Sequence, residues 1–463
     1  MLAGADSAGF DSVRDKPISR AERTKLGRSL RHQVPRAALA DWTPASDRID
    51  PVLQVELSQQ GRQDWLIPIR IGRMTATPYG FFRGSAGLMA ADVAALPATG
   101  IMPVVCGDAH LGNFGFYASP ERALVIDCND FDEAHPGCWE WDLRRLVASV
   151  HLAGRQNNAT EEQCSAAVRA CSRAYRAEVR ALARQPLLYR SFNRLDVDQL
   201  TESTADETLR AEIVRASGRA RRKTSDRALP RFTTTHHGRR RIVEEPPLIT
   251  RITGKQAEAL AVALDEYLQT LAPHWRRVVA GYTLVDLAHK VVGVGSVGLR
   301  AYVALLEGSS PDDVLFLQLK EANRSVLARF VHGNAAWHPH QGQRVVEYQQ
   351  ALQTVSDPLL GWTSVGDRQF YVRQFRDMKG AVTLESIDAA ALADYAGILG
   401  HLLAKGHART SGASMIAGYV GTSDNLDLAF AGFATAYADQ AEADHALLIE
   451  AVKRGRLPAE YGI

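Results

Sequence analysis

The sequence predicts an α+β fold, and three observations lead to that prediction. The chain has 463 residues, which is too long for one simple hydrophobic core, so we expect two or three packed units. Several stretches have apolar residues at helical spacing. In residues 139–155, for example, Leu143, Leu146 and Val150 lie on one stripe. Residues 289–322 are rich in Val, Leu and Gly and have the short alternating runs of a β-meander.

Composition and charge exclude several classes of protein. A hydrophobic content of 46% and a charged content of 23% are typical of globular proteins, and a net charge of +2 creates no field that would attract nucleic acid or a membrane. No apolar run approaches the roughly 20 residues that span a bilayer, and residues 1–30 lack a secretory h-region. The five cysteines form no CxxC pair, so we expect reduced thiols. We therefore expect a cytoplasmic protein.

Changes in composition divide the chain into segments. A polar, Arg-rich stretch opens an N-terminal extension over residues 1–72. Residues 73–275 form a largely helical segment with a basic connector at 218–241, which holds nine Lys or Arg and one acid. We interpret this connector as a solvated segment, with phosphate contact as the alternative, because interleaved aromatic residues are missing. Residues 276–380 are β-rich, and residues 381–463 are predicted to be helices that pack on the 73–275 segment.

The stretch "CGDAHLGNFG" sets Asp108, His110 and Asn113 close together between two short apolar runs. The runs on either side of "ASPER" are plausible strands, and Ser-Pro favours a turn. A hairpin centred on Pro120 would place Asn113 directly against Asp127. An amide oxygen and a carboxylate are hard ligands that suit Mg²⁺. An aspartate beside the metal, here Asp108, could orient and deprotonate a hydroxyl.

A second motif lies in the β-rich segment. The sequence "GVGSVG" fits GxGxxG, which is a weak signal alone, and it contains Gly293, Gly295, Ser296 and Gly298. The following "DVLFLQLKEA" alternates, so that its leucines face one side and Lys320 the other.

The β-rich segment resembles the nucleotide lobe of protein kinases, in which a glycine loop covers the ATP phosphates and a lysine on the third strand contacts them. This resemblance implies that the glycine loop and Lys320 bind ATP. It also implies a helical glutamate that braces Lys320, for which Glu347 is the candidate.

The first motif also resembles a family. "GDAHLGN" is similar to the GDxHxxN catalytic loop of aminoglycoside phosphotransferases and choline kinases, "LVID" to their metal-binding aspartate, and "WDLRRL" to the Asp-Leu that braces their loop. The resemblance implies that Asp108 is the catalytic base, that Asn113 and Asp127 bind Mg²⁺, and that His110 occupies the histidine position of the small-molecule kinases. Two further carboxylates, Asp130 and Asp132, leave the assignment of Asp127 open.

A wider block, residues 73–155 with "RMTATPYGFFRG" ahead of the loop and "NDFDEAHPGCWEWDLRRL" behind it, resembles the bacterial family DUF2252. That family name carries no established reaction.

The order of the two motifs is the reverse of that in kinases, because the glycine loop and Lys320 follow the catalytic loop. We therefore expect a circularly permuted, protein-kinase-like two-lobed fold with extra helices. Residues 395–410 resemble the helix that leads into the catalytic loop. Permutation is tolerated where the new junctions are exposed.

Together these features predict an ATP- and Mg²⁺-dependent phosphotransferase that acts on a small-molecule hydroxyl. A kinase-like protein that binds nucleotide without turnover, and an enzyme that transfers a nucleotidyl group, are the alternatives. Arg73 and Arg83 are candidates for binding a substrate anion.

Overall fold

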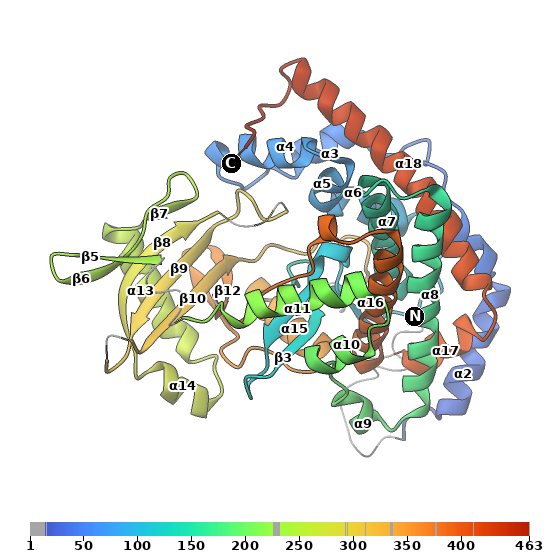
Figure 1. Cartoon of the computed structure of the whole chain (residues 1–463), viewed down its shortest axis with the longest axis horizontal. Helices are drawn as coiled ribbons and strands as arrows, with labels where there is room; N and C mark the ends of the chain where they lie inside the picture. Colours follow the sequence, from blue (N-terminus) through green and yellow to red (C-terminus); the bar gives the residue numbers. More distant parts are fainter. Residues whose placement is uncertain are drawn as a thin grey trace.

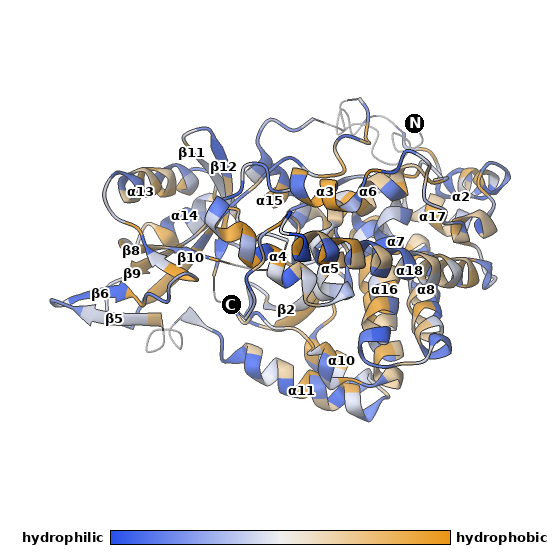
Figure 2. Cartoon of the chain, turned by 90° about the horizontal axis from the view of Figure 1, so that it is seen from above, coloured by the Kyte–Doolittle hydropathy of each residue, from blue (hydrophilic) through white to orange (hydrophobic). Residues whose placement is uncertain are grey.

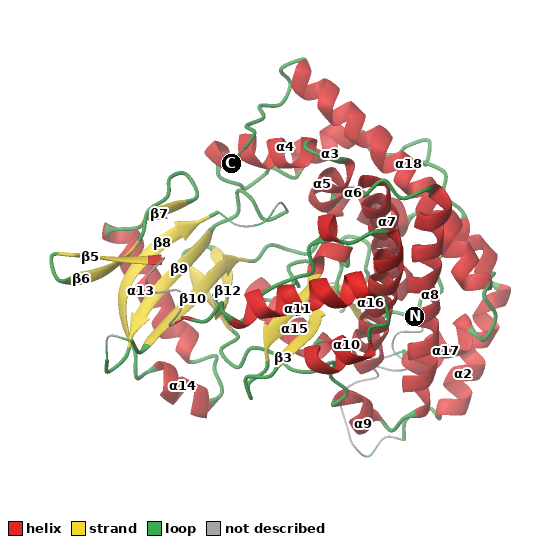
Figure 3. Cartoon of the chain, viewed as in Figure 1, coloured by secondary structure: helices red, strands yellow, loops and turns green. Residues whose placement is uncertain are grey.

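The computed structural model describes residues 14, 16–225, 232–291, 293, 295–310, 312–333, 337–375, 377–410 and 412–462. These residues form a β-rich region and a larger helical region, with a short hairpin between them (Figures 1 and 3). The prediction of a mixed α and β fold is confirmed.

Long helices build the helical region, and shorter helices surround them. The long helices are α7 (Trp139–Gln156), α8 (Glu161–Arg184), α16 (Ala389–Thr410) and α18 (Asn425–Lys453). The shorter ones are α2 (Arg20–Ser29), α9 (Leu187–Ser191), α10 (Val197–Ser203), α11 (Glu207–Arg221) and α17 (Ala413–Val420). Helices α16 and α8 approach closely at Gly400, where a Cβ atom would lie 2.1 Å from the Cys171 carbonyl oxygen. Helices α16 and α18 pack on both α7 and α8, and α17 packs on α8.

Helix α7 differs from the amphipathic helix that its periodicity indicates, because it is buried on every side from Trp139 to Gly154. Some of its charged residues, such as Asp142 and Arg145, have internal hydrogen-bond partners, whereas the three side-chain nitrogens of Arg144 have none among the described residues. Glu140 also has such a partner, because it accepts a hydrogen bond from the Thr99 backbone N–H at 2.7 Å.

Four short helices between residues 51 and 94 lie above the helical region in the view of Figure 1. They are α3 (Pro51–Leu57), α4 (Ile67–Thr75), α5 (Pro78–Gly84) and α6 (Ala86–Ala94). Five 3₁₀ turns complete the helical elements: η1 (Leu30–His32), η2 (Arg36–Ala40), η3 (Asp64–Leu66), η4 (Leu111–Asn113) and η6 (Leu384–Ser386).

A six-stranded antiparallel sheet forms the β-rich region in the order β11-β12-β10-β9-β8-β7. Its strands are β7 (Ile249–Arg251), β8 (Thr283–Lys290), β9 (Ala301–Glu307), β10 (Val314–Glu321), β11 (Gly361–Val365) and β12 (Arg368–Gln374), and its helices are α13 (Gly254–Leu268), α14 (Pro273–Val279) and α15 (Gln341–Leu352). The predicted alternation of β10 is confirmed, because Leu315, Leu317 and Leu319 share one core with α13, whereas Phe316 belongs to the core on the opposite face.

Three small hairpins or strand pairs complete the fold: β1 (Val104–Val105) with β4 (His135–Pro136), β2 (Phe114–Ala118) with β3 (Leu124–Cys128), and β5 (Thr233–His236) with β6 (Arg239–Ile242). The basic connector at 218–241 includes the end of α11 and the β5–β6 hairpin, while 226–231 lie outside the described residues. Figure 2 shows this largely hydrophilic hairpin extending away from the helical region.

In the described part of the chain, none of the helices has the length and apolar character needed to cross a bilayer. All five cysteines are buried free thiols, as the sequence predicts.

Candidate active site

The loop at residues 106–113 is anchored by α7 and α16. The Asp142 carboxylate on α7 accepts hydrogen bonds from the backbone N–H groups of Cys106 and Gly107, at 2.6 and 2.9 Å. His407 on α16 lies 3.2 Å from the same carboxylate. The predicted bracing role of the Asp in "WDLRRL" is therefore confirmed. The loop is held in place by residues that themselves are buried.

Asp108 is held by one arginine. Its Oδ1 accepts a hydrogen bond from Arg145 Nε at 2.7 Å, and Arg145 also donates to the Phe82 carbonyl. Burial raises the pKa of Asp108 to about 6, although Arg145 opposes that shift. A carboxyl group with this pKa is ionised at neutral pH and can still accept a proton, which suits a general base.

His110 lies beside Asp108, with its Nε2 3.9 Å from Asp108 Oδ2. Its Nδ1 accepts a hydrogen bond from the Gly112 N–H at 3.1 Å, which shapes the loop. Burial, followed by the positive charges of Arg145 and Arg83, keeps the pKa of His110 well below its ordinary value. His110 is therefore a neutral imidazole next to the carboxylate.

The predicted hairpin forms, but its register differs from the prediction. Phe114 pairs with Cys128 and Gly115 with Asp127, because the turn lies one residue later than a turn centred on Pro120. Asn113 consequently faces Asn129, whose N–H donates to the Asn113 carbonyl at 2.9 Å. The prediction that Asn113 lies directly against Asp127 is wrong.

The Asp127 carboxylate pairs with a lysine of α16 and does not contact Asn113 across the hairpin. Its Oδ2 lies 2.8 Å from the Nζ atom of Lys405 on α16, and both side chains are buried. Asp127 does not line the cavity that contains Asp108 and Asn113. The geometry therefore favours Asp130, which lines that cavity, as the carboxylate that accompanies Asn113.

Lys320 joins the two regions of the molecule at Asp132. Its Nζ lies 2.8 Å from Asp132 Oδ2 and 3.9 Å from Asp130 Oδ1. Tyr371 donates to Asp132 Oδ1 at 2.8 Å, and Ser296 of the glycine loop donates to Oδ2 at 3.2 Å. Burial alone would raise the pKa of Asp132, but Lys320, Tyr371 and Arg373 together outweigh burial and lower it. Asp132 is therefore an ionised carboxylate.

The glycine loop connects β8 and β9, as predicted for a nucleotide lobe, although Val292 and Val294 lie outside the described residues. Gly293 and Gly298 have φ angles of 69° and 92°, and residues with a side chain rarely adopt this backbone conformation. The N-terminal segment holds this loop, because the Gln63 N–H donates to the Gly298 carbonyl at 2.8 Å and Arg62 donates to the Val297 carbonyl.

One cavity of about 460 Å³ brings the two motifs together. Residues of both motifs line it, namely Asp108, His110, Asn113, Asp130, Asp132, Gly293, Gly295 and Ser296. The neighbouring Glu133 also lines it, and burial raises the pKa of Glu133 to about 7. The cavity thus combines a base, oxygen ligands and a glycine loop.

A family model for DUF2252, described as an uncharacterized protein conserved in bacteria, matches residues 62–451. The chain belongs to the DUF2252 family. No curated protein and no solved structure matches it. The match covers both motifs and begins at Arg62, so in this DUF2252 protein the family region includes the segment that holds the glycine loop.

The predicted brace between Lys320 and Glu347 is wrong for this DUF2252 protein. Glu347 lies on the outer side of α15, where it contacts His338 at 3.0 Å and Gln343 at 2.7 Å. Arg344 is one of the buried residues of α15, and it donates to the carbonyls of Asp132 and Asn323 at 2.8 and 2.9 Å. Lys320 is instead paired with the two aspartates that follow β3.

The sequence analysis did not predict the two cationic side chains that pair with Asp108 and Asp127, which are Arg145 and Lys405. Arg145 follows Asp142 by three residues, and that spacing places both on one side of α7, so this partner could have been found. Lys405 lies 278 residues from Asp127 along the chain, and no local pattern indicates that contact.

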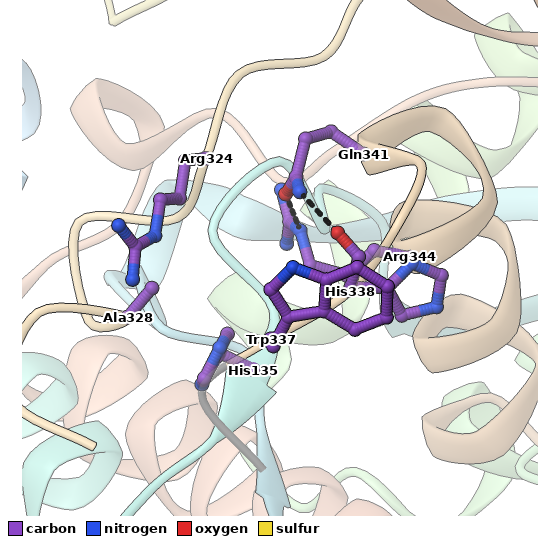
Figure 4. Close-up of a pocket in the computed structure, with 7 residues that line it drawn as sticks. All are labelled: His135, Arg324, Ala328, Trp337, His338, Gln341 and Arg344. Carbon is purple, nitrogen blue, oxygen red and sulfur yellow. Dashed lines mark hydrogen bonds between the residues drawn. The ribbon is translucent and has the colours of Figure 1, made fainter. Parts of the chain in front are cut away.

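A second, smaller cavity of about 250 Å³ lies beside α15 and shares the lining residue Arg324 with the main cavity (Figure 4). Gln341 connects its lining residues, donating to the His338 carbonyl at 3.1 Å and accepting from Arg344 Nε at 2.8 Å (Figure 4). Arg344 thus lines this cavity while its other nitrogen atoms hold the Asp132 loop.

The donor set in the main cavity fits Mg²⁺ that arrives with phosphates. Asn113 uses its amide nitrogen to donate to the Asp108 carbonyl at 2.7 Å, which leaves the amide oxygen for a ligand. Asp130 supplies a carboxylate in the same cavity. Within the described ranges, no group of three or more His, Cys, Asp and Glu could hold a metal by itself. Mg²⁺ commonly uses one or two carboxylates and completes its shell with phosphates and water.

Proposed function

We propose that this protein is an ATP- and Mg²⁺-dependent phosphotransferase that acts on the hydroxyl group of a small molecule. The observation that carries the proposal is that Lys320 and Ser296 both contact Asp132, which lines the cavity that also contains Asp108 and Asn113. Phosphoryl transfer in kinases requires such a combination of a base, a metal-binding aspartate and asparagine, a lysine and a glycine loop.

The order of elements supports a circularly permuted, kinase-like fold. The succession of β8, the glycine loop, β9, β10 with Lys320 and then α15 follows the order of the kinase nucleotide lobe. Helix α16 comes late in the chain, yet Thr410 at its end accepts a hydrogen bond from the Val104 N–H at 3.2 Å. A late helix therefore leads in space into the strand before the catalytic loop, as a permuted connection requires.

The chemistry follows from the positions of the side chains. Asp108, oriented by Arg145, accepts the proton of the acceptor hydroxyl. The hydroxyl oxygen forms a bond to the γ-phosphorus, and the bond from that phosphorus to the β–γ bridging oxygen breaks, so that ADP leaves. Asn113 and Asp130 would hold Mg²⁺, which supplies charge neutralisation when bound. Most of the rate enhancement would come from positioning and electrostatics.

The test is incubation of the full chain with Mg²⁺, candidate metabolite pools and ATP labelled at either the α or the γ phosphate. We expect γ label on a metabolite, and we expect Asp108→Asn to reduce transfer by about 10²–10⁴-fold while Mg·ATP still raises Tm. Asp198→Asn is the matched control, since its side chain is 77% exposed and lies on α10.

Each other outcome has a distinct meaning. Transfer of α label would replace the proposal with nucleotidylation. A rise of Tm with Mg·ATP but no transfer to any pool would favour a binding protein without turnover. Unchanged turnover in Asp108→Asn would remove Asp108 from its role.

A further inference from the structure

The main cavity is lined by a buried arginine for which the described residues supply no counter-ion. Arg70 on α4 is 1% exposed, and its Nη2 donates to the Gly84 carbonyl at 2.9 Å. Its Nε and Nη1 atoms are buried and have no hydrogen-bond partner among the described residues. Burial, followed by the like charge of Arg62, holds the pKa of Arg70 well below its ordinary range. An unpaired buried guanidinium is costly, and an anion in the cavity would relieve that cost.

A second arginine of the cavity, Arg83, shares this feature. Arg83 on α5 precedes Gly84 and lines the cavity, and its Nε is also buried without a partner in the described part of the chain. The positive charge of Arg83 lowers the pKa values of both Asp108 and His110. Arg83 is therefore close enough to the catalytic loop to act on a group bound there.

Two neighbouring arginines, Arg62 and Arg73, have other roles. Arg62 donates to the Val297 carbonyl and to the Ser58 carbonyl, and Arg73 donates to the Gly293 carbonyl. Both therefore hold the glycine loop. Arg70 and Arg83 both line the cavity, and each has at least one buried side-chain nitrogen without a partner in the described part of the chain.

We propose that the acceptor carries an anionic group, a phosphate or carboxylate, that binds Arg70 and Arg83 while its hydroxyl meets Asp108. This inference rests on the proposed function. Arginine is well suited to this role because its planar group binds carboxylate and phosphate oxygens through paired hydrogen bonds. The same charges would repel cationic acceptors such as aminoglycosides and choline. The acceptor class therefore differs from that of the enzymes whose catalytic loop this one resembles.

The phosphates of the nucleotide have the same chemistry as an anionic acceptor, so the test separates the two sources. Inorganic phosphate is titrated calorimetrically into the full chain saturated with Mg²⁺ and a non-hydrolysable ATP analogue. We expect phosphate to bind this loaded protein. Arg83→Gln should lower the affinity for phosphate by at least about tenfold, and it should leave the affinity for the analogue within about twofold of the wild-type value.

Two further variants keep the test sharp. Arg70→Lys retains the positive charge but loses the paired hydrogen bonds of a guanidinium, so it should also lower the affinity for phosphate. Circular dichroism and Tm report whether this variant folds. Arg454→Gln is the control, because Arg454 is 75% exposed and pairs with Glu450 on α18. We expect no change in phosphate affinity for this control.

The outcomes are distinguishable. If the analogue binds and millimolar phosphate does not, the anionic acceptor is overturned and the proposed function stands. If Arg83→Gln weakens the analogue as strongly as phosphate, the arginines serve the nucleotide and the inference is overturned. If the analogue fails to bind while phosphate binding depends on Arg83, the proposed function is overturned and the anion site stands without an acceptor role.

Discussion

Two buried lysine–aspartate pairs lie on either side of the end of β3, and they have the same chemistry in different surroundings. In both pairs the lysine Nζ lies 2.8 Å from an aspartate Oδ2. The Lys405–Asp127 side chains are 1% and 5% exposed and join α16 to the hairpin. The Lys320–Asp132 side chains are 5% and 21% exposed, and Asp132 lines the cavity. Access to the cavity, and not the type of residue, therefore separates a structural pair from a candidate functional one.

Breaking the enclosed pair should have the largest effect on stability. Lys405→Met leaves the Asp127 carboxylate buried without its charged partner, so the free energy of unfolding should fall by about 3–5 kcal/mol. Urea denaturation measures this change. The double variant Lys405→Met/Asp127→Asn should recover part of the loss. A single variant with wild-type stability would show that the pair contributes nothing to the fold.

Breaking the pair at the cavity should affect nucleotide binding more than stability. In Lys320→Met, Asp132 keeps its hydrogen bonds from Tyr371 and Ser296 and its partial contact with solvent, so the loss of stability should be smaller than in Lys405→Met. Nucleotide at about 100 times its Kd stabilises a binding protein by about 2.7 kcal/mol. We expect Lys320→Met to lose most of this stabilisation in thermal denaturation with Mg·ATP. An undiminished rise of Tm would remove Lys320 from the nucleotide site.

The pH dependence of activity should report the ionisation of Asp108, which has no lysine partner among the described residues. Asp108 must be ionised to accept a proton, and burial raises its pKa to about 6. Activity should therefore fall as the pH decreases through about 6, by about tenfold in kcat/KM for each further pH unit. A profile of kcat/KM from pH 4.5 to 8 measures this. A flat profile down to pH 5 would contradict the role of Asp108 as base.

The smallest effect should come from the glutamate that does not contact Lys320. Glu347 is 45% exposed and pairs with His338. Glu347→Gln should change the free energy of unfolding by no more than about 0.5 kcal/mol. The same titrations with Mg·ATP should give wild-type affinity. A clear loss of affinity would mean that Glu347 moves to Lys320 when nucleotide binds.

Much of the fold could be predicted because its signals are local. The alternation of β10 and the turn between β2 and β3 each depend on residues close together in the sequence. The Asp142 brace joins residues 36 positions apart, and the resemblance of "WDLRRL" to the kinase motif predicts it. The register of the β2–β3 hairpin was predicted wrongly because it depends on where the turn closes, and the composition of the turn leaves that open by one residue.

The sequence by itself determined which chemical groups are available: a base, an asparagine, three aspartates, a glycine loop and a strand lysine. Tertiary structure alone decided which aspartate meets which lysine, that Glu347 faces outward, and that Arg70 is left without a counter-ion among the described residues. The physical reason is that ion pairs act over a few ångströms in space, whereas the partners here lie up to 278 residues apart along the chain.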